Sequence, residues 1–219
     1  MGAKTWMLVY AAGCAREALA AAPVLDRQAT QAWLARLFPG ETLLAQDDGD
    51  LGYTHPPDDQ IFAGCFGDGL AVVAAGEFGL DRPSMLDERF LLAAEGRRVH
   101  LHAMHSVADW FAFAVWDDRR LLRSLSLSPD SGFMENIGEP LDFERPFWNG
   151  ERPADDPQTL AAGEKPYPLP FHPLDLGEAA LQALFGYQLE GDIDASLLEP
   201  ESIPLMHFRR RRKSWFRLR

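Results

Sequence analysis

Residues 110–128, which decide the fold, read WFAFAVWDDRRLLRSLSLS. Successive side chains of a β-strand point to opposite faces of a sheet. The first half of this stretch carries large apolar residues on both faces, with Trp110 and Trp116 on one and Phe111, Phe113 and Val115 on the other. We therefore predict that residues 108–116 form an interior strand, with other elements covering both of its faces.

A second strand pattern at residues 121–127 follows the charged turn at 117–120. Ser124, Ser126 and Ser128 share one face, while Arg123 shares the other with two leucines. Such alternation is typical of a strand nearer the edge of a sheet. No Gly-x-Ser-x-Gly elbow surrounds the serines, so we expect an exposed face or side-chain hydrogen bonds there. Residues 99–105 form a third strand pattern directly upstream.

The rest of the chain adds strands and helices on either side of this centre. Further strands are predicted at residues 4–10, at 41–46, and in a hairpin of 61–66 with 70–75. Helices are predicted at residues 15–22, 26–38, 83–96 and 175–186. We expect Ser84 and Asp87 to form a capping pair, with Met85 buried. Asp175 and Glu178 are expected to cap the last helix, and Gly186 to end it.

Together these elements predict an α+β fold, in which three or four helices pack on a largely antiparallel sheet. We assign residues 1–207 to a single domain. Seven prolines between Pro146 and Pro173 indicate an irregular connection, because proline neither donates to a ladder nor continues a helix. Residues 208–219 form a separate basic tail.

The composition is that of an ordinary globular protein. The 219 residues are 47% hydrophobic and 25% charged, which is enough to form a sizeable core. With only two cysteines the chain has no disulfide framework, which favours a reducing compartment. No run of apolar residues is long enough to span a bilayer. We therefore expect a cytoplasmic protein.

Charge is distributed unevenly along the chain. The net charge is −12, yet the basic tail holds seven cations and no anion, which leaves 14 cations and 33 anions, or −19, for the remainder. The tail also contains Trp215 and Phe216, and its cations are Arg209, Arg210, Arg211, Arg212, Lys213, Arg217 and Arg219. This composition suits an anionic membrane surface or nucleic acid. The alternative is that the tail folds back on the acidic body.

Three side chains are weak candidates for a metal site. His100 and His102 would point to one face of a strand, as two metal ligands do, and Asp109 lies shortly after them. No cysteine or second His-x-His pair is spaced to complete the site, so we predict neither a metal nor another cofactor.

Arg123 is expected to need a carboxylate partner. It lies mid-strand between apolar neighbours, and a buried unpaired charge is very costly. Glu139 and Glu144 follow on the return segment and are the predicted partners. The resulting pair would act as a structural clamp or anchor a ligand.

Several motifs together resemble a known family. The chain opens Met1-Gly2-Ala3-Lys4-Thr5, and residues 105–111 (HSVADWF), 126–132 (SLSPDSG), 137–140 (IGEP), 167–174 (YPLPFHPL) and 184–186 (LFG) follow. This series resembles an uncharacterised, mainly actinobacterial family, a domain of unknown function that begins Met-Gly-Ala-Lys-Thr. The resemblance implies one compact cytoplasmic domain and no particular activity. It ends near Phe208, which implies that the basic tail is specific to this chain.

Our leading hypothesis is a non-enzymatic binding or regulatory protein. The acidic body would contact an unknown protein partner, and the basic tail an anionic one. The alternative is a small metal-dependent hydrolase that uses the region of His100, His102 and Asp109.

Overall fold

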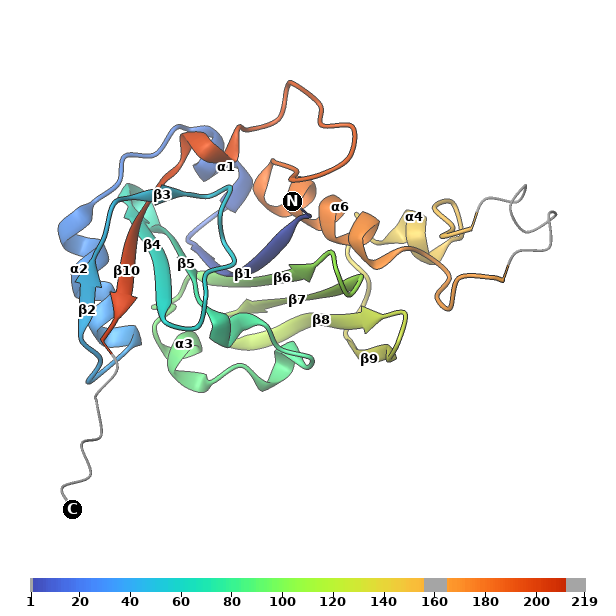
Figure 1. Cartoon of the computed structure of the whole chain (residues 1–219), viewed down its shortest axis with the longest axis horizontal. Coiled ribbons are helices and arrows are strands. Elements are labelled where there is room, and N and C mark those ends of the chain that lie inside the picture. Colours follow the sequence, from blue (N-terminus) through green and yellow to red (C-terminus); the bar gives the residue numbers. More distant parts are fainter. Residues whose placement is uncertain (1, 156–164, 212–219) are drawn as a thin grey trace, which may run out of the picture.

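The computed structural model describes residues 2–155 and 165–211, which form one sheet with helices around it (Figure 1). The strands are β1 (Lys4–Ala11), β2 (Leu43–Ala45), β3 (Gly49–Asp50), β4 (Gln60–Phe66), β5 (Leu70–Ala74), β6 (Arg98–His105), β7 (Trp110–Asp117), β8 (Arg120–Ser128), β9 (Gly132–Ile137) and β10 (Pro204–Arg210). The α-helices are α1 (Ala15–Ala20), α2 (Arg27–Leu37), α3 (Glu88–Leu92), α4 (Arg145–Trp148) and α6 (Pro173–Phe185). The described residues also contain four short 3₁₀ helices, η1 (Gly67–Gly69), η2 (Gly76–Phe78), η3 (Pro83–Met85) and η4 (Pro200–Ser202).

The strands lie in the order β2-β10-β4-β5-β1-β6-β7-β8-β9, with β3 paired to β10. The named strands pair antiparallel throughout. Strand β1 lies in the middle of this order, where Met7 is opposite Ala74 of β5 and His102 of β6. The predicted antiparallel sheet and its central first strand are therefore confirmed, and the fold is broadly α+β. Strands dominate it, however, and the described residues form five α-helices rather than the expected three or four. Strands β7 and β8, which we expected at the centre of the sheet, lie closer to the β9 edge.

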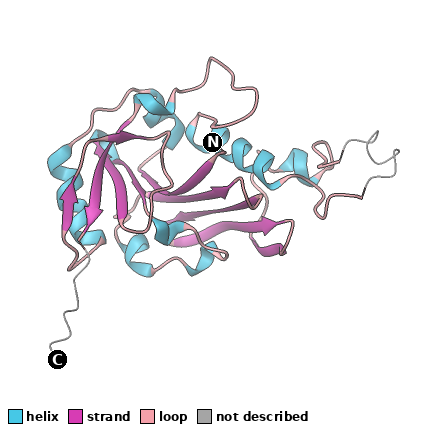
Figure 2. Ribbon diagram, in the orientation of Figure 1, coloured by secondary structure: helices cyan, strands magenta, loops and turns pink. Residues whose placement is uncertain are grey.

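Helices cover both faces of the sheet (Figure 2). On one face, Phe111 and Phe113 of β7 belong to the same buried cluster as Leu19 of α1 and Phe185 of α6. On the other, Trp116 of β7 shares a cluster with residues of α2 and α3. Strand β7 is thus buried from both sides, as its doubly apolar sequence predicts. The sheet is the middle layer of three.

The tight turn between β7 and β8 uses two residues with left-handed backbone. Asp118 and Arg119 have φ values of 44° and 64°. Positive φ at both central residues is the signature of the two-residue hairpin turn whose twist matches that of the strands. Aspartate tolerates this conformation better than most residues, whereas arginine does so at some cost in backbone strain.

Helix α2 forms as predicted, with the Asp26 side chain accepting a hydrogen bond from the Ala29 amide at 2.9 Å. The predicted third helix is instead divided into η3 and α3. Asp87 caps α3, but Ser84 does not cap it, and Met85 is 73% exposed rather than buried. Here the hydrogen bonds that Ser84 donates to the Glu135 side chain of β9 outweigh local helix propensity.

The last helix begins earlier than predicted and has a different cap. His172 is the N-cap of α6, and its Nδ1 atom accepts a hydrogen bond from the Leu174 amide at 3.3 Å. The expectation that Asp175 and Glu178 form the cap was therefore wrong. Gly186 ends the helix with a φ of 86°, as predicted, because a left-handed C-terminal residue strongly favours glycine.

The last described strand extends into the segment that we assigned to the basic tail. Residues 208–210 belong to β10, where they pair with β2, and Phe208 is buried. The folded domain therefore continues to Arg210, three residues beyond the expected boundary. Residues 212–219 and 156–164 lie outside the described part of the chain. Among the described residues, no helix has both the length and the hydrophobicity to cross a bilayer.

Candidate functional site

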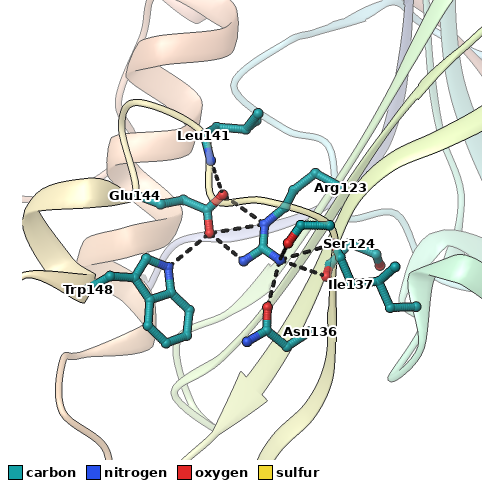
Figure 3. A network of polar contacts seen from close by, with 8 residues as sticks. Arg123, Ser124, Asn136, Ile137, Leu141, Glu144 and Trp148 are labelled. Carbon is teal, nitrogen blue, oxygen red and sulfur yellow. Dashed lines mark hydrogen bonds and ion pairs between the residues drawn. The ribbon is translucent and has the colours of Figure 1, made fainter.

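The charged residue in the middle of β8 forms the predicted ion pair (Figure 3). Both side chains, Arg123 and Glu144, are completely buried. The Nη2 atom of Arg123 lies 2.6 Å from Oε2 of Glu144, and its Nε atom lies 2.9 Å from Oε1. Two parallel N–H···O contacts of this kind are the strongest ion-pair geometry available to arginine.

The remaining contacts of this pair are also internal. Nη1 of Arg123 donates to Oδ1 of Asn136 at 2.6 Å and to the carbonyl oxygens of Ile137 and Gly138 at 3.0 and 3.1 Å. Glu144 accepts from the Leu141 amide at 2.7 Å and from Nε1 of Trp148 at 3.2 Å. The network therefore ties β8, β9 and α4 together and acts as a structural clamp (Figure 3).

Glu139, the other predicted partner of Arg123, is exposed and makes no hydrogen bond with it among the described residues. The glycine before it explains this arrangement. Gly138 has a φ of 82° and offers its carbonyl oxygen to Arg123, so the chain turns just before Glu139. The guanidinium therefore donates hydrogen bonds to backbone carbonyl groups of this turn and not to the Glu139 side chain.

The two strand histidines share one face as predicted, but they are part of the core. His102 is fully buried between Oγ1 of Thr5, 2.6 Å from its Nδ1, and the carbonyl oxygen of Gly177, 3.0 Å from its Nε2. Burial lowers the pKa of His102 to about 4, and burial aided by the charge of Arg98 does the same for His100.

Asp109 does not join these histidines. Its Oδ2 atom lies 3.6 Å from Nε2 of His172 and 3.5 Å from the hydroxyl of Tyr167. Within residues 2–155 and 165–211 there is no group of three or more His, Cys, Asp or Glu side chains able to hold a metal ion. The geometry therefore does not favour a metal-dependent hydrolase at His100, His102 and Asp109.

The first two cations of the predicted tail are paired with the body. Arg209 lies 3.1 Å from Asp59. Arg210 lies 2.6 Å from Glu77 and 3.3 Å from Glu41, and only 17% of its side chain is exposed. Arg211 is exposed, while Arg212, Lys213, Trp215 and Phe216 lie outside the described residues. Arg210 is thus held largely within the body, whereas Arg209 is paired with Asp59 but its side chain remains 62% exposed.

Sequence reasoning missed an acidic cleft beside α6. Its volume is about 490 Å³, and its charged or titratable lining residues are Arg152, His172, Asp175, Glu178, Glu190 and Asp192. They come from three segments: the turn after α4, the start of α6 and the chain that returns along α6. We call this the acidic cleft because four carboxylates face one arginine.

Glu178 is the unusual member of this cleft. It is 9% exposed, and its Oε2 atom accepts a hydrogen bond from the Leu189 amide at 2.8 Å. Its Oε1 atom is buried and has no hydrogen-bond partner among the described residues. Burial, together with the charges of Glu190 and Asp175, raises the pKa of Glu178 to about 7. The backbone amides of Leu189 and Glu190 oppose this rise.

The sequence did contain a signal for Glu178. It lies four residues after Leu174 and three before Leu181, on the helix face that packs toward the core. A carboxylate on such a face requires a partner or a shifted pKa. The capping pattern that Asp175 and Glu178 form in the sequence obscures this signal.

His172 lines the cleft and also contacts Asp109, outside it, while it caps α6. Its ring stacks on Tyr167 with the ring centres 5.2 Å apart, and its Nε2 atom faces Asp109. Because Nδ1 accepts the Leu174 N–H, the neutral ring carries its proton on Nε2. Burial, followed by the charge of Asp109 and its hydrogen bond, raises the pKa of Tyr167 to about 12.

Comparison with known proteins identifies the family of this chain. The model of the Family of unknown function (DUF6928) matches residues 5–208. Neither the curated proteins nor the solved structures contain a significant match. The match ends inside β10, close to the point where the sequence resemblance ends. The predicted actinobacterial origin stays a prediction. Because the match covers most of its length, the chain belongs to the DUF6928 family, whose function is unknown.

Proposed function

We propose that this protein is a non-enzymatic binding protein in which the basic residues after β10 contact a phosphate-bearing partner. The observation that carries the proposal is the division of charge at the end of β10. Arg209 and Arg210 are neutralised by Asp59, Glu41 and Glu77. Five further cations, and no anion, follow in residues 211–219.

Phosphate is the chemistry that such a segment recognises best. Each cation close to an anionic lipid surface contributes about 1 kcal/mol. Trp215 and Phe216 add apolar area that suits either a lipid interface or the face of a nucleic-acid base. The rest of the chain, strongly acidic, repels phosphate, so contact would be confined to this segment. The acidic body remains available for a protein partner, and a cytoplasmic setting suits all three contacts.

The structure shows where the chain can be shortened without removing any part of the sheet. A chain that ends at Arg211 keeps β10 intact, together with the ion pairs of Arg209 and Arg210. At low salt we expect the full chain to bind vesicles containing phosphatidylserine, or single-stranded nucleic acid, and the shortened chain to lose that affinity. Vesicle co-sedimentation and fluorescence anisotropy measure the two cases separately.

A charge-matched control distinguishes the effect of residues 211–219 from the effect of a change in net charge alone. Replacing Arg212, Lys213, Arg217 and Arg219 by glutamine should abolish binding as truncation does. Replacing four exposed arginines of the body (Arg16, Arg82, Arg119 and Arg120) by glutamine changes net charge equally and should leave the affinity nearly unchanged. If the shortened chain retains its affinity for both phosphate sources, the proposal is wrong.

A further inference from the structure

We propose that a cavity at the start of β1 binds a small zwitterion, either an amino acid or a short peptide, that carries an apolar side chain. We call this site the β1 cavity. Its volume is about 510 Å³, and its lining side chains include Lys4, Tyr53, His55, Val107, Leu189 and Glu201. None of its lining residues belongs to the segment 211–219, so the inference does not depend on the function proposed above.

Hydrogen bonds fix the loop after β3, which forms one wall of the β1 cavity. The Trp6 amide of β1 donates to the carbonyl oxygen of Thr54 at 2.6 Å, and Thr5 forms a parallel bridge with the same residue. The Leu51 amide donates to the carbonyl oxygen of Ile203, directly after η4, at 3.0 Å. The fold itself therefore holds β1, the loop and η4 in place around the cavity, as in most small-molecule sites.

The basic side chains of the β1 cavity lack a partner within the described part of the chain. Lys4 forms no ion pair there, and neither its Nζ atom nor the ring nitrogens of His55 form a hydrogen bond there. Both residues are half-buried, yet none of these nitrogens is enclosed, so a ligand can reach them. Burial, followed by the charge of Lys4, lowers the pKa of both His55 and His105, and no described carboxylate offsets this shift. A ligand carboxylate would therefore supply the counter-charge that Lys4 lacks.

The same cavity also carries a carboxylate without a partner. Glu201 of η4 is exposed, lies close to Gly52, and forms neither an ion pair nor a side-chain hydrogen bond within residues 2–155 and 165–211. Lys4 and Glu201 are thus opposite charges that line one cavity without pairing with each other. A molecule with a carboxylate and an ammonium group would pair with both. A simple cation would be repelled by Lys4, and a multiply charged anion by Glu201.

Apolar surface beside these charges favours a ligand with an apolar side chain. Tyr53 and Val107 are large apolar residues that stay 43% and 81% exposed, and Leu189 is half-buried. The ring of Tyr53 is fixed between His55 and Phe62, with ring centres 4.6 and 5.5 Å away. An apolar ligand side chain would remove this surface from water, and the cavity volume lies in the range of small-molecule sites.

Isothermal titration calorimetry of the full chain at neutral pH and low salt tests the proposal. L-Phenylalanine and the dipeptide glycyl-L-phenylalanine are the two probes, and the tighter of them shows whether the site suits a free amino acid or a peptide. Two analogues keep the apolar body but only one charge: 3-phenylpropanoate lacks the ammonium, and 2-phenylethylamine lacks the carboxylate. Each analogue should bind about tenfold more weakly than the better zwitterion.

Two pairs of variants assign the binding to the β1 cavity. Lys4→Gln and Glu201→Gln should each weaken it about threefold to tenfold, and the urea midpoint should not change because neither side chain has an ion-pair partner among the described residues. Lys165→Gln and Glu88→Gln remove the same charges at exposed positions outside the cavity and should have no effect.

Three results would overturn the proposal. The first is that neither zwitterion binds at millimolar concentration. The second is that an analogue with a single charge binds as tightly as the better zwitterion. The third is that the variants of Lys4 and Glu201 bind with the same affinity as those of Lys165 and Glu88.

Discussion

Arg123 and Glu144 lie 21 positions apart in sequence and form an ion pair in which neither side chain is exposed to solvent. The arginine belongs to β8, one strand from the sheet edge, and the glutamate precedes α4. The two charges neutralise each other. Hydrogen bonds with neighbouring amide and carbonyl groups satisfy further polar atoms of the two side chains. The pair therefore fixes the position of the segment that leads from the sheet to α4.

Removal of one partner of this pair should be far more damaging than removal of both. Glu144→Gln leaves the guanidinium of Arg123 buried without an opposing charge, which we expect to cost about 3–5 kcal/mol of unfolding free energy. The double variant Arg123→Met, Glu144→Leu should lose much less, because it buries no charge. Urea denaturation followed by circular dichroism measures both values. Equal losses in the two variants would contradict this account.

The sequence predicts the need for this pair but not its full geometry. A charged residue between apolar neighbours on a two-sided strand demands a carboxylate, and Arg123 stands in such a pattern. The choice between Glu139 and Glu144 depends on the left-handed turn at Gly138 and on the position of α4. Both are tertiary features, which no local pattern encodes.

A second buried carboxylate, on the opposite face of β8 and β9, should also stabilise the fold through its hydrogen bonds. Glu135 of β9 accepts from the backbone amide of Ser84 at 2.9 Å and from the hydroxyls of Ser84 and Ser124. We expect Glu135→Gln to reduce the unfolding free energy by about 1.5–3 kcal/mol, as for other hydrogen bonds to a charged group.

The exposed Glu139 provides the matched control for Glu135. It lies four residues further along the same chain segment, and Glu139→Gln should change the stability by less than about 0.5 kcal/mol. Chemical denaturation of the two variants gives the comparison. Similar losses at both positions would mean that the contacts of Ser84 and Ser124 do not stabilise the fold.

The serines also show where sequence reasoning stops. Their alternation along residues 121–127 predicted a strand correctly, and the expectation of side-chain hydrogen bonds holds for Ser124. The serine face is nevertheless buried, since Ser124 and Ser126 are fully covered. The cover comes from η3, a segment that we had predicted as the start of a helix. The local sequence favours an α-helix here, but packing against the sheet stabilises the short 3₁₀ helix η3 instead.

Stability should fall as the pH is lowered, because two core histidines resist protonation. The folded-state pKa of His100 and of His102 is about 4, whereas an unfolded histidine has a pKa of about 6.5. The unfolded chain therefore binds more protons between these values. The stability is complete above pH 6.5 and is lost as the pH falls toward 4, by roughly 3 kcal/mol for each histidine.

Glu178 acts in the opposite direction and must be removed to isolate this effect. Its pKa is raised from 4.5 to about 7, so the folded chain binds more protons than the unfolded chain between those values. Protonation of Glu178 thus adds stability as the pH falls through this window. We expect Glu178→Gln to make the loss of stability between pH 6.5 and pH 4.5 steeper than in the unaltered chain. Urea titrations at several pH values in this window measure the slope.

A second substitution, made in the Glu178→Gln variant, shows how much of the pH dependence of stability comes from His102. Glutamine at position 102 keeps an amide that can hydrogen-bond near Thr5 and Gly177 but cannot be protonated in this range. His102→Gln combined with Glu178→Gln should therefore lose about half of the pH dependence that the two buried histidines produce. The other half belongs to His100, whose Nδ1 atom is buried without a partner among the described residues. An unchanged slope would show that the pKa of His102 is the same in the folded and the unfolded chain, which its position in the apolar core argues against.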